Sequence, residues 1–356
     1  MPSNSPFHPL DISRLAQILD RIRSISVGVV GDFCLDAYWQ LDDGEAGLSL
    51  ETGKPTVTVE RQRYSPGGAG NVVSNIASLG VRRFSAFGVL GNDLFGDELL
   101  RQLNTPRVDT GGLVHQEAGW QTSVYAKPYK GTEEQSRIDF GRSNSISPEA
   151  EQKLISALAE GISGLDALVI NQQIPRSIFT ARLVTTLNSL ALQHPEKIFV
   201  LDSRHRIADF RSMICKLNAM EVAALSGKRV KRNEDVAIGE LREYAGALFR
   251  QTQKPVFTTR SQLGLFFYDG NDSIEIPSAK TEDPIDPVGA GDTVVAAIAS
   301  SLGAGTSLLE SGVFAMVAAS VTVRKLRQTG TATPLEMLNF ARQSQENNGP
   351  TDRLVS

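Results

Sequence analysis

The chain has 356 residues, with 36 lysines and arginines against 40 aspartates and glutamates, and a formal net charge of −4. This length is sufficient for one large α/β domain with a small appendage. The acidic balance excludes a nucleic-acid-binding surface, because the one short basic run, residues 228–232, is typical of a solvated loop. Cys34 and Cys215 lie far apart without metal-ligand spacing, which excludes a disulfide scaffold and fits a reducing compartment.

The first ten residues lack a basic segment followed by an apolar one, so they do not resemble a secretory signal. No uninterrupted apolar run is long enough to span a bilayer. We therefore expect a cytoplasmic protein that binds neither membrane nor nucleic acid.

The first elements are a helix and a strand. Apolar residues recur at helical spacing from Ile12 to Ile22 and predict a peripheral helix. The run from Ile25 to Asp32 is rich in β-branched residues and ends in Gly-Asp, which is typical of a buried parallel strand whose carboxyl end carries function. The ligand-binding edge of the sheet is therefore expected to begin at Asp32.

Two carboxylates, Asp32 and Asp36, are expected in a loop just past this strand. Carboxylates suit sugar hydroxyls because each accepts several hydrogen bonds, and charged acceptors bind more strongly than neutral ones. By themselves, the two residues are better explained as a turn aspartate and a surface aspartate than as sugar ligands.

Residues 38–64 and 119–141 change the pattern. Alternating apolar and polar residues in Pro55–Arg61, Thr122–Lys127 and Ser136–Phe140 are typical of strands. They predict a small β sheet inserted between the early strand–helix units.

The run Gly67-Gly68-Ala69-Gly70-Asn71 leads into an apolar helix that Gly80 ends. Glycines at a helix start let a substrate lie against the backbone, and Asn71 offers donors and an acceptor to a polyol. A tight strand-to-helix turn is the alternative explanation.

Further apolar runs at 84–93, 167–171 and 198–202 alternate with helical segments, one of them near residues 176–193. This alternation predicts a parallel sheet with helices on both faces. Binding residues then collect at the carboxyl ends of the strands.

The run Asp286-Pro-Val-Gly-Ala-Gly-Asp-Thr293 precedes a helix rich in alanine and valine. Glycines at 289 and 291 expose consecutive N–H groups at a helix start, where they attract an anion such as phosphate. A carboxylate at Asp292 is explained if it accepts the proton of a hydroxyl that attacks phosphorus. A helix N-cap aspartate is the alternative.

This run and the Gly67–Asn71 run resemble the two motifs of the ribokinase family of sugar kinases, also called the phosphofructokinase B family. The resemblance implies a ribokinase-like three-layer α/β sandwich with a mostly parallel central sheet and a small β-sheet lid, which often joins two subunits into a homodimer. The implied division assigns residues 1–37, 65–118 and 142–345 to the kinase core, 38–64 and 119–141 to the lid, and 346–356 to a tail.

The resemblance also implies ATP-dependent phosphorylation of a sugar or sugar phosphate, with ATP and Mg²⁺ required. Asp292 would be the general base, and the anion hole would comprise Gly289, Ala290 and Gly291. Sugar contacts are implied for Asp32, Asp36, Gly67, Gly68 and Asn71. Nucleotide contacts are implied for Asn218, Thr259, Gly264, Gly289, Gly291 and Gly330, while Met316 stands where relatives carry an asparagine near adenine. Metal contacts are implied for Glu221, for Asn218 through water, and for Asp286 with a monovalent cation such as K⁺.

Asn218-x-x-Glu221 alone is better explained by a capped helix start than by a metal site. The segment from Thr259 to Gly264 is equally well explained by a hairpin turn. Within the family, the chain is most similar to the heptose 7-phosphate kinase branch, but two lysines of that branch are absent, and Arg176 or Arg204 are candidates to replace them. The sugar thus stays open. Two other functions stay open as well: an inactive sugar- or nucleotide-binding protein, and a nucleoside or hydroxymethylpyrimidine-type kinase.

Overall fold

The computed structural model describes residues 10–42, 44, 47–104, 108–225, 227–230, 235–279, 281, 283–326 and 329–348. Most of the segment expected as a C-terminal tail, from residue 349 onward, lies outside this part. No helix in these ranges combines the length and apolarity that crossing a bilayer requires.

A nine-stranded sheet forms the centre of the molecule, in the order β14-β13-β12-β11-β10-β9-β1-β4-β5. All neighbours pair in parallel except at β13, which is antiparallel to both β12 and β14. Apolar runs such as β1 and β9 are buried almost throughout, as expected for parallel strands covered on both faces. The strands are β1 (Ser26–Gly31), β4 (Arg83–Gly91), β5 (Val108–Gln116), β9 (Ala167–Gln172), β10 (Ile198–Ser203), β11 (Ile214–Asn218), β12 (Val256–Thr259), β13 (Leu265–Tyr268) and β14 (Ser273–Ile276).

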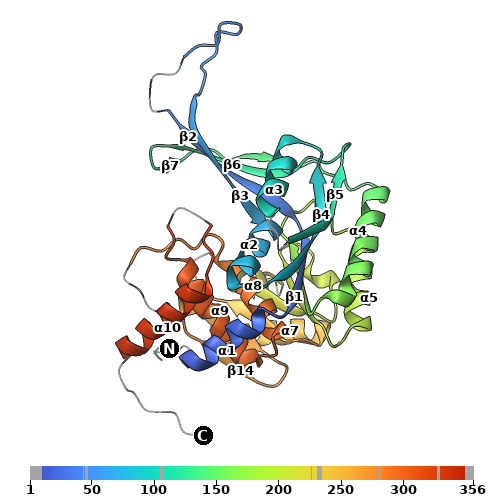
Figure 1. The fold of residues 1–356 in the computed structure, drawn as a ribbon, viewed down its shortest axis with the longest axis vertical. Helices are drawn as coiled ribbons and strands as arrows, with labels where there is room; N and C mark the ends of the chain where they lie inside the picture. The colour runs from blue at the N-terminus through green and yellow to red at the C-terminus, as the bar shows by residue number, and fades with distance from the viewer. Residues whose placement is uncertain are drawn as a thin grey trace.

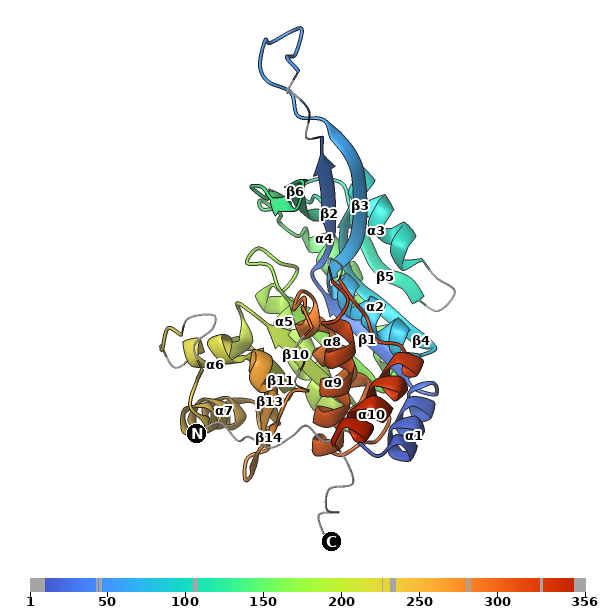
Figure 2. The same ribbon diagram turned by 90° about the vertical axis from the view of Figure 1, so that its left-hand side faces the viewer.

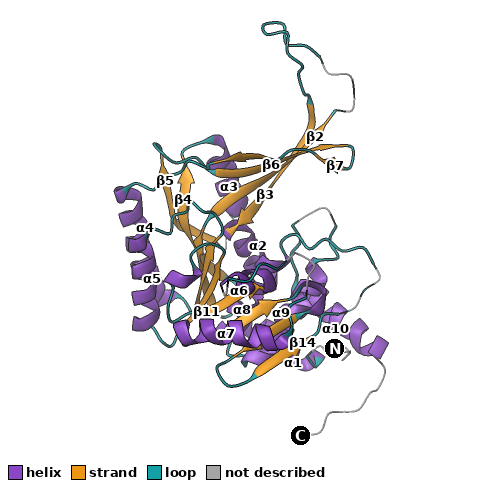
Figure 3. Cartoon of the chain, turned by 180° about the vertical axis from the view of Figure 1, so that it is seen from behind, coloured by secondary structure: helices purple, strands orange, loops and turns teal. Residues whose placement is uncertain are grey.

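Helices cover both faces of this sheet and form two separate hydrophobic cores. Figures 1 and 3 show α4 and α5 on one side of the molecule and α1, α9 and α10 on the other. The first core includes α1 (Ile12–Ile22), α2 (Ala69–Leu79), α3 (Leu94–Leu103), α8 (Ala290–Gly303), α9 (Leu308–Thr322) and α10 (Pro334–Asn348). The second core includes α4 (Pro148–Gly161), α5 (Ala181–Gln193), α6 (Ala219–Leu225) and α7 (Ile238–Thr252).

A smaller five-stranded sheet stands at one end of the core (Figure 2). Its strand β2 pairs antiparallel with β3 and parallel with β6. The structure thus corrects one expectation: Asp36 lies within β2 rather than in a loop, because the chain enters this sheet directly after Asp32. The strands are β2 (Phe33–Leu41), β3 (Val59–Gly68), β6 (Ser123–Lys130), β7 (Glu133–Glu134) and β8 (Ile138–Phe140). The division into core and lid at residues 38–64 and 119–141 stays a prediction.

The helix expected near residue 176 begins later, at Ala181. Its N-cap is Thr180, whose hydroxyl accepts a hydrogen bond from the Leu183 N–H. Residues 173–179 therefore form a loop after β9. Because β1 lies between β9 and β4, this loop and Asp32 follow strands at the point where the strand order reverses, which is where open α/β sheets bind ligands.

Candidate active site

Asp292 lies in the first turn of α8, and its carboxylate meets Asn71 of α2. The Asn71 Nδ2 atom donates a 2.7 Å hydrogen bond to Asp292 Oδ2. The N-cap of α8 is Gly289, in the left-handed region at φ +81° and without a side-chain cap. Asp292 is therefore not an N-cap, so the alternative explanation of this residue is wrong.

A hydrogen-bond chain fixes the orientation of the Asn71 amide. Asn75, one turn later in α2, donates from Nδ2 to Asn71 Oδ1 at 3.2 Å and to the Asn71 backbone oxygen at 2.9 Å. Thr293 in turn donates to Asn75 Oδ1 at 2.8 Å. All three side chains are buried, and the chain of bonds directs the Asn71 amino group at Asp292.

The surroundings of Asp292 raise its pKa to about 6. Burial is the largest cause, and repulsion by the Asp202 carboxylate adds to it. The Asn71 hydrogen bond and the positive charges of Lys216 and Arg204 act in the opposite direction. A carboxyl group with this pKa is ionised at neutral pH and binds a proton more readily than an ordinary aspartate.

Lys216 is a second charged group beside the glycine turn, and the sequence patterns did not identify it. Its Nζ atom forms a 2.9 Å ion pair with Asp202, and both side chains are 6% exposed. A Cβ atom on Gly291 would lie 3.1 Å from Lys216 Nζ, so the ammonium group is next to the expected anion hole. Attraction to Asp202 and Glu221 raises the Lys216 pKa against the opposing effect of burial, which keeps the group charged.

Asn218 and Glu221 form a reciprocal cap at the start of α6. The Glu221 N–H donates to Asn218 Oδ1, and the Asn218 N–H donates to Glu221 Oε2, both at 2.8 Å. The structure thus contains the capped helix start that competed with a metal role. Burial raises the Glu221 pKa, and Glu221 Oε1 lies 4.0 Å from Arg204 Nε.

The described residues contain no cluster of three histidine, cysteine, aspartate or glutamate side chains that could enclose a metal ion. Mg²⁺ associated with a nucleotide needs few protein ligands, because phosphates and waters complete its shell. Glu221 Oε1, which takes no part in the cap, fits such a role. The Asp286 carboxylate accepts a 3.0 Å hydrogen bond from the Val288 N–H and so shapes the turn before Gly289.

The glycines expected to contact sugar also permit close packing. A Cβ atom on Gly67 would lie 3.0 Å from Asp36 Oδ2, and one on Gly68 would lie 2.4 Å from the Asp32 backbone oxygen. Gly68 has φ +54°, which side-chain-bearing residues rarely adopt. The structure therefore brings Gly67, Gly68, Asp32 and Asp36 together beside Asn71.

Asp32 is 4% exposed and binds the loop that follows β9. Its Oδ2 atom accepts hydrogen bonds from the Gln173 N–H at 2.7 Å and the Ile174 N–H at 2.9 Å, and its Oδ1 atom accepts one from the Ser177 hydroxyl. Burial raises the Asp32 pKa to about 6 although these bonds favour the charged form. Much of its acceptor capacity is used within the protein, and its sugar contact stays a prediction.

Asp36 forms a 2.9 Å ion pair with Lys127 of β6, and both side chains are largely buried. Lys127 Nζ also lies 4.9 Å from the centre of the Tyr38 ring. Despite burial, attraction to Asp36 raises the Lys127 pKa. The ion pair leaves one Asp36 oxygen next to Gly67.

Three other residues expected at the nucleotide, Thr259, Gly264 and Gly330, make contacts within the protein. Thr259 Oγ1 donates to the Leu217 backbone oxygen at 3.3 Å. Gly264, at φ +94°, would place a Cβ atom 2.1 Å from the Ile276 oxygen, and Gly330 would place one 2.8 Å from the Thr322 oxygen. Backbone packing alone requires both glycines, and Met316 lies in the buried interior of α9. The nucleotide contacts stay predictions.

The model of the pfkB family of carbohydrate kinases matches residues 28–336. The chain is 29% identical over 333 residues to the bifunctional protein HldE of Trichlorobacter lovleyi, covering 92% of this chain and 65% of that protein. It is 28% identical over 319 residues to HldE of Gluconobacter oxydans, covering 89% of this chain and 64% of that protein. The chain thus spans just under two thirds of the length of these curated relatives.

Solved structures share the fold. Phosphofructokinase-2 from Escherichia coli, solved with potassium, superposes with a TM-score of 0.70 at 19% identity and covers 90% of this chain and 99% of its own. Arabidopsis thaliana ribokinase, solved with ribose and ATP, gives a TM-score of 0.68 at 18% identity, with coverage of 89% and 99%. The fold expected from the sequence is confirmed, and the chain belongs to the pfkB family of carbohydrate kinases.

Proposed function

We propose that the protein transfers the terminal phosphoryl group of ATP to a hydroxyl group of a sugar, with Asp292 as the general base. The observation that carries this proposal is the hydrogen bond between Asn71 Nδ2 and Asp292 Oδ2. It joins the two glycine-rich runs and leaves Asp292 Oδ1 to accept the proton of a sugar hydroxyl.

The pKa of Asp292, about 6, supports this role. Above pH 6 the carboxylate is ionised and ready to accept a proton. Hydrogen bonds also orient the Asp292 carboxylate. Asn71 donates to it, and Asn75 in turn holds the Asn71 amide in place. A positioned base contributes on the order of 10²-fold or more to a rate.

Positive charge for the transferred phosphoryl group comes from two sources in the chain. The N–H groups at Gly289, Ala290 and Gly291 lie at the start of α8, whose first turn attracts anions, and the Ala290 N–H also donates a 3.2 Å hydrogen bond to the Pro287 oxygen. Lys216 Nζ lies beside Gly291 and is held there by Asp202. Donors fixed before the reaction stabilise developing charge without reorganisation.

Glu221, with Asn218 through water, would hold Mg²⁺, and Asp286 would contribute to a K⁺ site. Bound Mg²⁺ neutralises charge on the nucleotide phosphates. The Arabidopsis ribokinase structure contains ATP and ribose, and the Escherichia coli phosphofructokinase-2 structure contains potassium, which supports ATP as the phosphoryl donor and a K⁺ site by analogy.

Three further assignments belong to this proposal. The small sheet acts as a lid over the sugar, it joins two copies into a homodimer, and the enzyme works in the cytoplasm. Because the chain spans under two thirds of the HldE relatives, the proposal concerns phosphoryl transfer alone.

The substitution Asp292→Asn tests the proposed function. It removes the base but keeps the size of the side chain, so we expect kcat to fall at least ~10²-fold while ATP binding is retained. ADP release is measured over a panel of sugars and sugar phosphates, and ATP binding by calorimetry. Asp20→Asn, on the exposed surface of α1, is the matched control. Normal turnover by Asp292→Asn would contradict the role of this residue, and ATP binding without ADP release by the wild-type protein would favour a binding protein.

A further inference from the structure

A cavity of about 450 Å³ lies at the edge of the central sheet opposite to the proposed active site. Arg23 precedes β1 and Arg82 precedes β4, so both arginines stand at the amino-terminal ends of strands, whereas Asp32 follows the carboxyl end of β1. The ends of α1 and α2, the turn before β4 and the start of α10 form the cavity wall. Figures 1 and 2 show α1 beside α10 in this region. The volume falls in the range of sites for small molecules.

The wall of this cavity is positively charged. Arg23 and Arg82 line it, and the described residues that line it include no carboxylate. Within the described part of the chain, the Arg82 side chain forms no ion pair or hydrogen bond. Arg23 lies 3.7 Å from Asp20, whose side chain is 81% exposed, and such a surface pair contributes little energy. Both guanidinium groups are therefore available to an anion.

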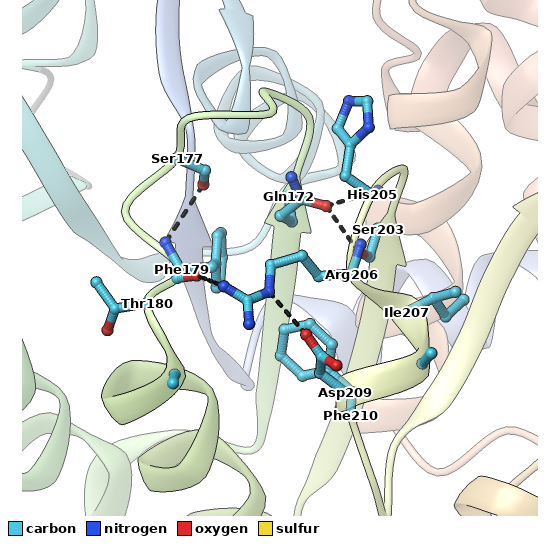
Figure 4. A network of polar contacts seen from close by, with 12 residues as sticks. Gln172, Ser177, Phe179, Thr180, Ser203, His205, Arg206, Ile207, Asp209 and Phe210 are labelled. Atoms are coloured by element: carbon cyan, nitrogen blue, oxygen red, sulfur yellow. Dashed lines mark hydrogen bonds and ion pairs between the residues drawn. The ribbon is translucent and has the colours of Figure 1, made fainter. Parts of the chain in front are cut away.

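A paired arginine elsewhere in the structure shows what Arg82 lacks. Arg206 donates a 2.8 Å hydrogen bond to Asp209 and a 2.5 Å hydrogen bond to the Phe179 oxygen, as Figure 4 shows. Arg206 could bind a ligand only if these contacts broke. An anion that binds Arg82 breaks no contact of this kind, so its binding energy is not spent on the loss of an ion pair.

The carboxylate that approaches this wall from α10 is already paired. Glu336 accepts hydrogen bonds from the N–H and the hydroxyl of Thr333, both at 2.8 Å. It also forms a 2.7 Å ion pair with Lys325. Because its charge is balanced, Glu336 repels an anion in the cavity less than a free carboxylate would.

Helix α2 connects the cavity to the proposed base. Asn71, in its first turn, donates to Asp292, while Ala77 and Ser78, in its last turn, line the cavity. Ser78 comes seven positions after Asn71, a distance of about 10 Å along the helix axis. A ligand that contacts the last turn of α2 therefore acts on the helix that orients Asp292.

A second connection runs along the segment before α10. A Cβ atom on Gly289 would lie 2.8 Å from Thr329 Cγ2, so Thr329 packs against the proposed anion hole. Two residues later, Thr331 accepts a 2.9 Å hydrogen bond from the Ser78 hydroxyl, and Thr333 lines the cavity. The segment thus spans from the anion hole to the cavity wall.

We propose that this cavity is a second binding site, which takes a small organic phosphate, and that a ligand bound there tightens the binding of ATP at the active site. Arg23 and Arg82 would bind the phosphate through paired, charge-assisted hydrogen bonds, and the volume leaves room for the organic part. The ligand would join α1 to the start of α10 and so hold the segment that packs against Gly289 before ATP arrives. Only the effect on ATP rests on the proposed kinase function.

Calorimetry on the full chain tests the binding site. Adenosine monophosphate, glucose 6-phosphate, inorganic phosphate and glucose are titrated into protein that is saturated with Mg²⁺ and a non-hydrolysable ATP analogue, which occupy the proposed nucleotide site. We expect one of the two organic phosphates to bind at least ~10-fold more tightly than inorganic phosphate and glucose. The one that binds shows whether the cavity prefers a nucleotide or a sugar phosphate.

Arginine variants show whether that binding occurs in the cavity. Arg23→Ala and Arg82→Ala should each weaken it at least ~10-fold, and Arg82→Glu should abolish it. All of these side chains are exposed, so the variants should fold. Arg83→Ala removes the neighbouring exposed charge, which does not line the cavity, and is the matched control. Equal binding to wild type and to the Arg23 and Arg82 variants would refute the site.

The effect on ATP is measured as KM with and without the organic phosphate. With it, KM for ATP should be at least ~3-fold lower in wild type and Arg83→Ala than in Arg82→Ala, and without it the three values should agree. The comparison cancels any competition at the active site, which all three proteins share. Equal KM values with the phosphate present would refute the coupling.

The two proposals fail separately. If no acceptor releases ADP, the kinase function fails, and calorimetry still decides the coupling. The Kd of the ATP analogue should then fall on addition of the organic phosphate in wild type and stay unchanged in Arg82→Ala. An unchanged Kd in wild type would refute the coupling.

Discussion

Asn71 Nδ2 and Asp292 Oδ2 lie 2.7 Å apart although 221 positions separate the two residues in the chain. The bond joins the start of α2 to the first turn of α8. Asn71 comes three residues after Gly68, and Asp292 comes three residues after Gly289. Both glycines have positive φ angles, and each forms the turn from which the next helix begins. The bond therefore places the proposed base where the two glycine turns meet.

The pH dependence of catalysis should follow the Asp292 carboxyl group. Its pKa is about 6, and a base acts only when deprotonated, so kcat/KM should fall as the pH drops through 6. The Asn71 hydrogen bond lowers this pKa, so Asn71→Ala should raise it and move the acidic limb of the profile to higher pH. A profile of kcat/KM between pH 5 and 9 measures the shift. An unmoved acidic limb in the variant would contradict the assignment.

The same carboxyl group should destabilise the fold at neutral pH. Its pKa in the folded state, about 6, exceeds the ordinary value of 3.8, so the folded state binds the proton more tightly than the unfolded state. Stability must then decrease as the pH rises from 3.8 to 6. Asp292→Asn should therefore increase the free energy of unfolding at pH 8 by on the order of 1 to 3 kcal/mol. Urea titrations at pH 8 and pH 5 test this, because the gain should shrink at pH 5, and a less stable variant at pH 8 would contradict it.

Local patterns predicted the glycine turns correctly because a turn and the helix that follows it depend on a few adjacent residues. The two helices expected after the glycine runs are present, although they begin at Ala69 and Ala290 rather than at Val72 and Val294, and Gly80 ends α2 at φ +99° as expected. The helix predicted from near Arg176 to Gln193 begins later, at Ala181, so the prediction was wrong for its first residues. Asp32, from a distant part of the chain, binds the loop there, and no local pattern contains that contact.

Contacts across strands were also missed. Lys216 and Asp202 come together because β10 and β11 pair in a particular register, with Leu201 opposite Cys215. The alternation of apolar and polar residues identifies a strand, but it does not determine which strands are neighbours or how they are aligned. The available signal was a lysine inside the apolar run Ile214–Leu217, since a buried charge requires a partner.

Removal of Lys216 should lower both stability and turnover, and a second substitution should separate the two effects. Lys216→Met leaves Asp202 buried without its partner and should cost roughly 3 to 5 kcal/mol of stability. The double variant Lys216→Met/Asp202→Leu removes both charges and should recover much of that loss. Turnover should stay low in both variants if Lys216 stabilises the transferred phosphoryl group. Thermal unfolding and kcat measured together test the assignment, and full activity of the stabilised double variant would refute it.

Glycine substitutions should separate structural from ligand-contacting positions. Gly264→Ala places a Cβ atom 2.1 Å from the Ile276 backbone oxygen and 2.6 Å from the Ser278 nitrogen. Relief of these clashes requires the backbone to move, because both atoms belong to it. We expect a loss of stability of on the order of 2 to 4 kcal/mol, with KM for ATP unchanged in the protein that still folds. Gly131→Ala, at φ +58° with nothing within 4 Å, measures the cost of the backbone angle alone, which should be about 1 kcal/mol.

Gly289→Ala completes the comparison at the proposed anion hole. Its Cβ atom would lie 2.8 Å from Thr329 Cγ2 and 2.9 Å from Asn71 Nδ2, so it would displace the amide that holds Asp292. We expect kcat to fall at least ~10²-fold, because both the phosphate-binding turn and the base move. Thermal unfolding and steady-state kinetics on all three variants provide the test. If Gly264→Ala raised KM for ATP without loss of stability, Gly264 would be a nucleotide contact rather than a packing requirement.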